Sequence, residues 1–128
     1  MGGKAKIVAG LVVGMIIGAV AVPGLRAQTA GPATYIVAEM HATDPAAFIE
    51  YMRLEPGSLA PFHGRVVARG LPDVREGAAP DGVVTIYAFG NPEDANRWYN
   101  SPDYAKLMAM RQKSAKSKVY FLTGIVTQ

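Results

Sequence analysis

The side chains best suited to chemistry are charged groups at alternate positions of two short apolar segments. In TYIVAEMHA (residues 34–42), strand alternation places Glu39 and His41 on one face. In RVVARG (residues 65–70), the same alternation places Arg65 and Arg69 on one face. A carboxylate or an imidazole can move a proton when it is suitably desolvated. A guanidinium group suits a planar oxyanion such as a carboxylate or an enolate.

Two further polar residues lie on predicted elements. Tyr87 shares a strand face with Thr85, and Arg111 shares a helix face with Tyr104, seven residues earlier. We predict catalytic roles for Glu39 and His41 and ligand-binding roles for Arg65, Arg69, Tyr87 and Arg111. A structural alternative is that Glu39 and one arginine neutralise each other in a buried sheet.

The residue types exclude several kinds of site. The chain has no cysteine and only two histidines, so neither a thiol nucleophile nor a metal site is expected. His41 is expected at the rim of a strand end, and His63 is expected to form a local hydrogen bond before Gly64. No glycine-rich phosphate loop follows a strand. We therefore expect no metal and no cofactor.

Apolar periodicity predicts the order strand, helix, strand, strand, helix, strand. The strands are expected at 34–42, 65–70, 82–89 and 118–127, with helices over 46–54 and from 91 to about 111, the second restarting near 101–103. The simplest compact arrangement is an α+β ferredoxin-like sandwich, with both helices on one face of an antiparallel sheet. Phe48, Ile49 and Met52 are expected to share the buried side of the first helix, and Trp98 to pack toward the sheet.

This arrangement leaves the second face of the sheet uncovered. The residues expected on that face are Val37, Val67, Val83, Tyr87, Val119 and Phe121. An apolar sheet open to water favours face-to-face pairing of two copies. We therefore predict a homodimer with the candidate ligand site in the cleft between its subunits.

The first residues are typical of a targeting segment. Lys4 and Lys6 precede sixteen residues without charge (7–22), followed by Pro23-Gly24 and small residues. We predict a signal peptide or membrane anchor at 1–27, a linker at 28–33 and one domain at 34–128. The protein is then exported, periplasmic or extracellular, or held at the inner membrane by this segment alone.

The charge balance argues against a nucleic-acid partner. Three of the thirteen Lys and Arg residues precede position 28, whereas all ten acidic residues follow it, so the domain has no net charge. Nucleic-acid binding depends on an excess of positive charge. The remaining basic cluster is expected on the exposed face and last turn of a helix: Arg111, Lys113, Lys116 and Lys118.

Four segments together resemble the domain-of-unknown-function family 1330 (DUF1330) of the dimeric α/β-barrel superfamily. They are TYIVAEMHATDPAAFIEY, FHGRVVARG, VVTIYAF and NPEDANRWYNSPDYAKLMAMRQ, which span nearly all of residues 34–126. The resemblance implies a ferredoxin-like subunit that dimerises through its sheet. It implies no reaction, although the wider superfamily includes cofactor-free monooxygenases, isomerases and haem enzymes.

Two functions from different classes follow. In the first, the dimer binds a small apolar or aromatic anionic molecule, and any catalysis is independent of a cofactor. In the second, the protein is a non-catalytic accessory or interaction dimer of the cell envelope, whose polar groups pair with one another. An empty pocket lined by unpaired charges favours the first function, and a filled cleft favours the second.

Overall fold

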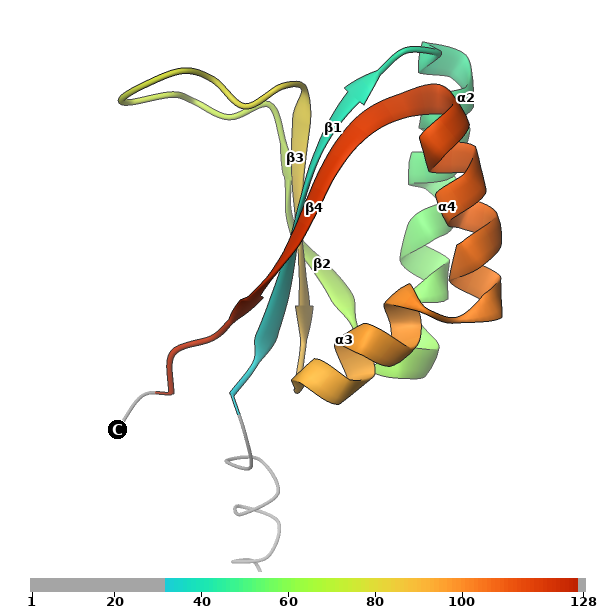
Figure 1. The fold of residues 1–128 in the computed structure, drawn as a ribbon, viewed down its shortest axis with the longest axis vertical. Coiled ribbons are helices and arrows are strands. Elements are labelled where there is room, and N and C mark those ends of the chain that lie inside the picture. Colours follow the sequence, from blue (N-terminus) through green and yellow to red (C-terminus); the bar gives the residue numbers. More distant parts are fainter. Residues whose placement is uncertain (1–31, 127–128) are drawn as a thin grey trace, which may run out of the picture. The chain divides into compact units, whose positions relative to one another are not determined.

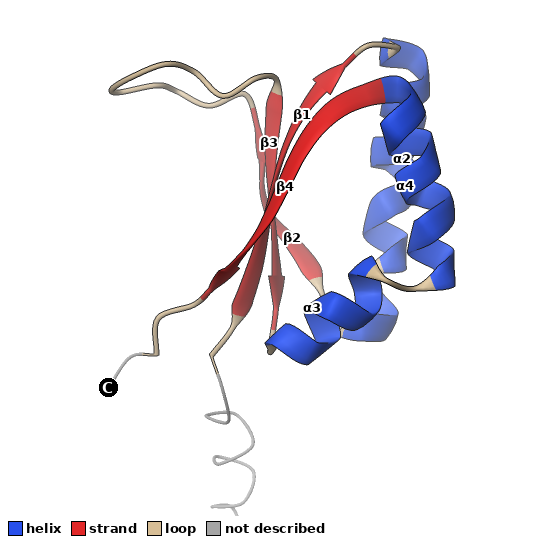
Figure 2. Cartoon of the chain, viewed as in Figure 1, coloured by secondary structure: helices blue, strands red, loops and turns tan. Residues whose placement is uncertain are grey.

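The computed structural model describes residues 32–126. A four-stranded antiparallel sheet has the order β2-β3-β1-β4, formed by β1 (Thr34–Ala42), β2 (Arg65–Gly70), β3 (Val83–Phe89) and β4 (Ala115–Thr123). The helices α2 (Pro45–Leu54), α3 (Pro92–Tyr99) and α4 (Pro102–Ser114) all lie on one side of it (Figures 1 and 2). The ferredoxin-like prediction for the fold is confirmed. The predicted targeting segment lies outside the described residues.

Each helix begins at a polar cap followed by proline. The caps are Asp44, Asn91 and Ser101, and each side chain accepts a hydrogen bond from the backbone N–H three residues later. Proline fits the first helical position because it lacks an N–H that would have no partner there. Between α2 and β2 the chain forms two short 3-10 turns, η1 (Glu55–Ser58) and η2 (Ala60–Phe62).

The core lies between the sheet and the helices. Ile36, Ala38 and Met40 of β1 are buried there, beneath large aromatic side chains from the helices. Trp98 is 1% exposed and donates a hydrogen bond from Nε1 to Ser58 Oγ at 2.9 Å. The prediction that Trp98 packs toward the sheet is confirmed.

The uncovered side of the sheet, here called the open face, differs from the predicted one. Its side chains include Tyr35, Val37, Val84, Ile86, Tyr120 and Leu122. The prediction was right for Val37 but wrong for Val83, Tyr87, Val119 and Phe121, which lie on the helix side. On that side the Tyr87 ring packs against Trp98, and the Phe121 ring packs against Tyr99, which fills the layer between the sheet and the helices.

Other boundaries also moved. β4 runs over Ala115–Thr123 rather than 118–127, because the chain passes from α4 into the strand without a loop. Lys116 and Lys118 are therefore strand residues, and Arg111 is buried rather than solvated. Lysine suits an edge strand such as β4 because it discourages pairing with other chains.

On α2, the prediction that Ile49 is buried was wrong, since Ile49 is 67% exposed. Tyr51 lies in the core beside Phe48 instead.

The longest connection is the segment between β2 and β3, residues 71–82, here called the β2–β3 arm. It extends away from the sheet on the side opposite the helices (Figure 1). Among the described residues, no helix is long and apolar enough to cross a membrane.

Candidate functional site

A buried carboxylate lies in the layer between the sheet and the helices. Glu55 is fully buried at the start of η1. Its side chain follows Phe48 and Tyr51 at helical spacing, which places it on the same inward face as those two residues. Glu55 was not among the predicted site residues, although its helical spacing to two aromatic core residues was a signal for its burial.

Two strands supply the partners of Glu55. Arg69 of β2 donates from Nη2 to Oε1 at 2.7 Å and to Oε2 at 2.9 Å. Tyr87 of β3 donates from its hydroxyl to Oε2 at 2.5 Å. Arg69 Nε also donates to Thr85 Oγ1 at 3.0 Å. The carboxylate is thus satisfied by a cation and a phenol, which is what a charge needs in a buried environment.

These contacts define the charge states of the cluster. Burial raises the pKa of the Tyr87 phenol, and the Glu55 carboxylate raises it further, so the phenol stays protonated and donates. Burial opposes ionisation of Arg69, but the Glu55 carboxylate outweighs it and the pKa of Arg69 is raised. The cluster is therefore an ion pair with one added neutral donor.

A second polar group lies deeper under α2 and α4. The hydroxyls of Tyr51 and Tyr104 are 3.1 Å apart and share a hydrogen bond. Burial raises the pKa of Tyr104, although the Tyr51 hydroxyl and the Arg111 guanidinium oppose that rise. Tyr104 and Arg111 face the same side of α4, as their spacing predicted, and both are buried.

Arg111 is a buried cation without a carboxylate. It is 4% exposed, and within residues 32–126 it forms no ion pair. Its Nε is buried without a hydrogen-bond partner in the described part of the chain. Arginine stays charged in proteins, and a buried charge without a counter-ion costs several kcal/mol. The surroundings of Arg111 therefore favour a small anion.

Aromatic rings line the same layer. The ring of Trp98 lies 4.0 Å from that of Tyr104 and 5.3 Å from that of Tyr87, measured between centroids. Tyr99 contacts Phe121 edge to face at 5.5 Å. These contacts combine apolar ring faces with a few phenol hydroxyls, which suits recognition of a flat apolar molecule.

The six predicted site residues do not converge on one cleft. Arg69, Tyr87 and Arg111 lie on the helix side of the sheet, and Glu39, His41 and Arg65 lie on the open face. The register of β2 against β3 shifts between Val66 and Ala68, so the expectation that Arg65 and Arg69 share a face was wrong. The sheet separates the two groups.

The open-face residues have partners of their own. Tyr120 donates to Glu39 Oε2 at 2.5 Å, and His41 Nδ1 lies 3.2 Å from Asp81 Oδ1. The alternative ion pair between Glu39 and an arginine is absent from the described residues, and Arg69 pairs with Glu55 on the other side of the sheet. His63 adopts a left-handed backbone conformation and reaches Asp94 Oδ2 at 3.4 Å rather than a local partner.

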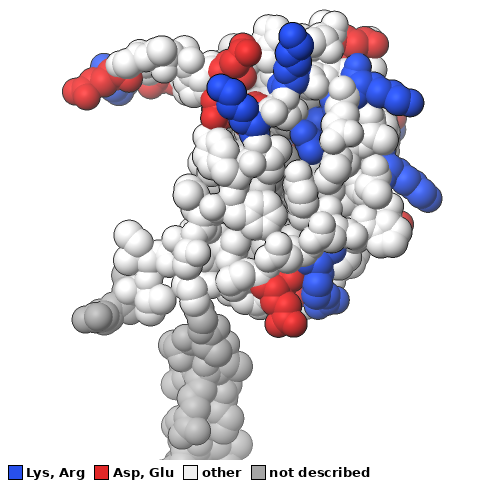
Figure 3. Space-filling model, viewed as in Figure 1, with Lys and Arg blue, Asp and Glu red and all other residues white. Residues whose placement is uncertain are grey.

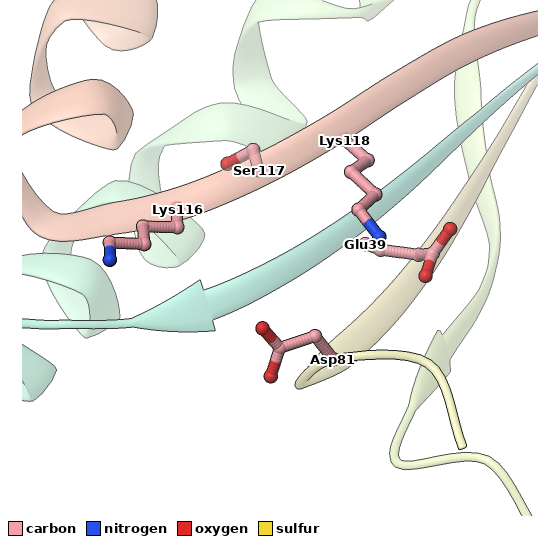
Figure 4. Close-up of a pocket in the computed structure, with 5 residues that line it drawn as sticks. All are labelled: Glu39, Asp81, Lys116, Ser117 and Lys118. Carbon is pink, nitrogen blue, oxygen red and sulfur yellow. The ribbon is translucent and has the colours of Figure 1, made fainter. Parts of the chain in front are cut away.

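A shallow hollow of about 190 Å³ lies at one end of the open face (Figure 4). It is lined by Glu39, Asp81, Lys116, Ser117 and Lys118. Its walls carry both signs of charge, and neither lysine forms an ion pair within residues 32–126. The same residues contain no cluster of three metal-binding side chains.

The fold and this inner layer define a ferredoxin-like α+β domain with a buried polar cluster. The chain belongs to the family "Domain of unknown function (DUF1330)", whose model matches residues 33–125. No curated protein matches it.

Solved structures share the fold at low sequence identity. SnoaB, a cofactor-independent oxygenase from Streptomyces nogalater, is 18% identical with a TM-score of 0.56, over 77% of this chain and 97% of its own. A protein of unknown function from Rhodopseudomonas palustris is 17% identical with a TM-score of 0.60, over 80% of this chain and 92% of its own. A dimeric ferredoxin-like protein of unknown function from Thermobifida fusca is 10% identical with a TM-score of 0.50, over 73% and 92%.

Proposed function

We propose that the protein binds a small apolar or aromatic anionic molecule in the layer between its sheet and its helices. The observation that carries this proposal is Arg111, which is buried at 4% exposure without an anionic partner in the described residues. A ligand carboxylate or enolate would supply the missing counter-charge. Arg111 keeps its predicted ligand-binding role in this proposal. The proposed ligand site, however, lies inside one subunit and not in a cleft between two subunits.

The apolar part of the ligand follows from the neighbours of Arg111. Tyr104 stacks near Trp98 on one side of the layer, and Tyr99 and Phe121 form a second aromatic pair. Small movements of these rings would make room for a ligand, since side chains commonly change rotamer on binding. The ligand class is therefore a compact aromatic or apolar monoanion.

Any chemistry at this site would use protein groups alone. Glu55 is the carboxylate of the layer, and Tyr87 is a neutral donor held against it. A shift of Tyr87 toward a ligand would leave the Glu55 carboxylate able to accept a proton. The fold shared with SnoaB, itself a cofactor-independent oxygenase, is compatible with this proposal. The catalytic roles of Glu39 and His41 stay predictions, on the other side of the sheet.

We also propose that the protein functions as a homodimer. Val37 and Ile86 are neighbours on adjacent strands of the open face, with Tyr35, Tyr120 and Leu122 exposed around them. Pairing two such faces would remove apolar surface from water, which stabilises association by roughly 25 cal/mol per Å². The Thermobifida fusca protein with this fold is described as dimeric, which supports the same arrangement here.

The location of the protein is also a proposal. The basic start and short apolar run at 1–27 favour export from the cytoplasm, with the domain periplasmic, extracellular or tethered at the inner membrane. Sequencing the N-terminus of protein recovered from cell fractions tests this. A protein that starts near Gln28 outside the cytoplasm is expected, and a full-length cytoplasmic protein would contradict export.

Nuclear magnetic resonance can test the ligand proposal, because the chain has a single tryptophan. The indole N–H signal of Trp98 should shift on titration with benzoate or 1-naphthoate and much less with uncharged benzamide. Arg111→Gln should weaken aromatic carboxylate binding at least tenfold, about 1.4 kcal/mol.

The matched control removes a charge from the same helix. Lys113 is exposed, so Lys113→Gln should leave binding unchanged. Circular dichroism would confirm that both variants fold. Equal weakening in both variants, or equal binding of benzamide and benzoate, would overturn the role of Arg111.

The second function, a non-catalytic envelope dimer, is favoured by one observation. The Glu55 carboxylate already has a complete set of partners in Arg69 and Tyr87. If no aromatic anion binds while the protein is a stable dimer, this second function is the better account.

A further inference from the structure

The β2–β3 arm has almost no support from its own domain. Residues 71–79 are all exposed. Within the described residues, no backbone hydrogen bond joins residues 71–82 to the rest of the domain outside the strand ladders. The ion pair from Arg75 to Asp73 at 2.7 Å is internal to the arm, and among the described residues only the pair from Asp81 to His41 Nδ1 at 3.2 Å joins its base to β1. A structureless connection of this length is uncommon in a small domain and is often functional.

The direction of the arm is nevertheless defined at its base. Gly82 has φ +81, and a Cβ on it would lie 2.1 Å from the carbonyl oxygen of Met40. Only glycine permits both this backbone conformation and this close approach to β1. Pro72 and Pro80 restrict the backbone on both sides of the tip. The arm therefore points away from the helices. Its two prolines lower its conformational entropy, so less entropy is lost when it binds a partner.

The arm carries apolar side chains into solvent. Leu71 is 77% exposed and Val74 is 40% exposed. The arm projects away from the sheet, on the side that has no helix (Figure 1). Exposed apolar groups beside an apolar sheet face are typical of an interaction surface.

The charges on this side are complementary to each other. In Figure 3, charged side chains gather at the tip of the arm. The tip contains Asp73, Arg75 and Glu76, with one net negative charge. Lys116 and Lys118 border the hollow at one end of the open face, without ion pairs in the described residues. A two-fold interface needs a surface that complements itself. Within the described residues Glu76 at the tip forms no ion pair, so it can meet Lys116 or Lys118 of the other copy.

We propose that the β2–β3 arm clasps a second copy of this chain, with Leu71 and Val74 packing on the partner. The inference rests on the homodimer proposed above and adds that the arm is part of its interface. The arm of each subunit would contact the other subunit, because a two-fold interface uses the same elements twice.

Sedimentation equilibrium over a dilution series tests the inference. In one variant, a two-residue Asn-Gly turn replaces residues 72–82, which keeps β2 and β3 joined as a hairpin. A second variant, Leu71→Ser with Val74→Ser, keeps the length of the arm. Both should remain folded by circular dichroism, and both should raise the dimer dissociation constant at least tenfold.

Ile49→Ser is the matched control, because Ile49 is 67% exposed on α2, on the other side of the sheet. It should leave the dissociation constant unchanged. If both arm variants dimerise as tightly as the unmodified protein, the arm inference is wrong while the dimer stands. If the unmodified protein is a monomer throughout, the proposed dimer and the arm inference both fall.

Discussion

Arg65 and Arg69, four residues apart on β2, point to opposite faces of the sheet. Arg65 lies opposite Ala88 on the open face, and Arg69 lies opposite Thr85 on the helix side. The register shift between Val66 and Ala68 inserts one residue and reverses the alternation. This one irregularity brings a guanidinium group to the buried Glu55 carboxylate, and it separates the inner polar layer from the open face.

The Glu55–Arg69 pair should contribute strongly to stability. Arg69→Met leaves a fully buried carboxylate without its cation, so the free energy of unfolding should fall by about 3 kcal/mol or more. Urea denaturation followed by Trp98 fluorescence measures this. The exposed pair Glu50–Arg53 is the control, and Arg53→Met should cost less than about 1 kcal/mol. Similar losses in both variants would show that burial of Glu55 does not matter.

The buried tyrosines should make the protein sensitive to alkali. Burial raises the pKa of Tyr51 and of Tyr87 above the ordinary value, which is about 10 for tyrosine. Above that pH the unfolded chain loses protons that the folded chain keeps, so the free energy of unfolding falls as the pH rises. Each such tyrosine adds up to about 1.4 kcal/mol per pH unit to that slope.

Tyr51→Phe should therefore flatten the fall in stability between about pH 10 and 11. At pH 7 the variant should lose about 1 kcal/mol, because the hydrogen bond to Tyr104 is removed. Urea denaturation at a series of pH values measures both effects. An unchanged slope would mean that Tyr51 ionises in the folded protein as it does in the unfolded chain.

Gly82 should tolerate no side chain. Gly82→Ala places a Cβ against the Met40 carbonyl in a left-handed conformation, and a loss of about 2 kcal/mol or more in the free energy of unfolding is expected. Gly77 has a similar φ of +79 but open space around it, so Gly77→Ala should cost only about 1 kcal/mol. Thermal or urea denaturation compares the two. Equal costs would argue that the base of the arm is not held against β1.

The open face should govern self-association. Ile86→Lys places a charge at its centre beside Val37 and should convert the dimer to a folded monomer. Ile49→Lys makes the same change on the exposed side of α2 and should leave the dimer intact. Size-exclusion chromatography with light scattering separates the outcomes. A dimer that survives Ile86→Lys would require a different interface.

The element order and the helix starts could be predicted because they depend on local signals. The Asp-Pro, Asn-Pro and Ser-Pro pairs each mark a helix start that the structure contains. The strand faces depend on register, which local composition does not encode where a bulge intervenes. Glu55 was missed because a carboxylate beside proline in a turn looks solvated until the facing strands are known.

Arg111 was placed correctly on the face of Tyr104, because helical spacing is regular over two turns. Its burial could not be predicted, since the neighbouring lysines suggested an exposed helix end. In the structure the helix ends at Ser114 with Lys113 exposed in its last turn, and Lys116 and Lys118 belong to β4.

Native mass spectrometry of protein purified gently from its own cells is the sharpest test of anion binding at Arg111. We expect a dimer that carries a small anionic compound on its subunits, and a dimer of the Arg111→Gln variant that carries none. If the same compound remains on the Arg111→Gln protein, or the unmodified protein carries nothing and gains no benzoate or 1-naphthoate when these are added, anion binding at Arg111 is contradicted.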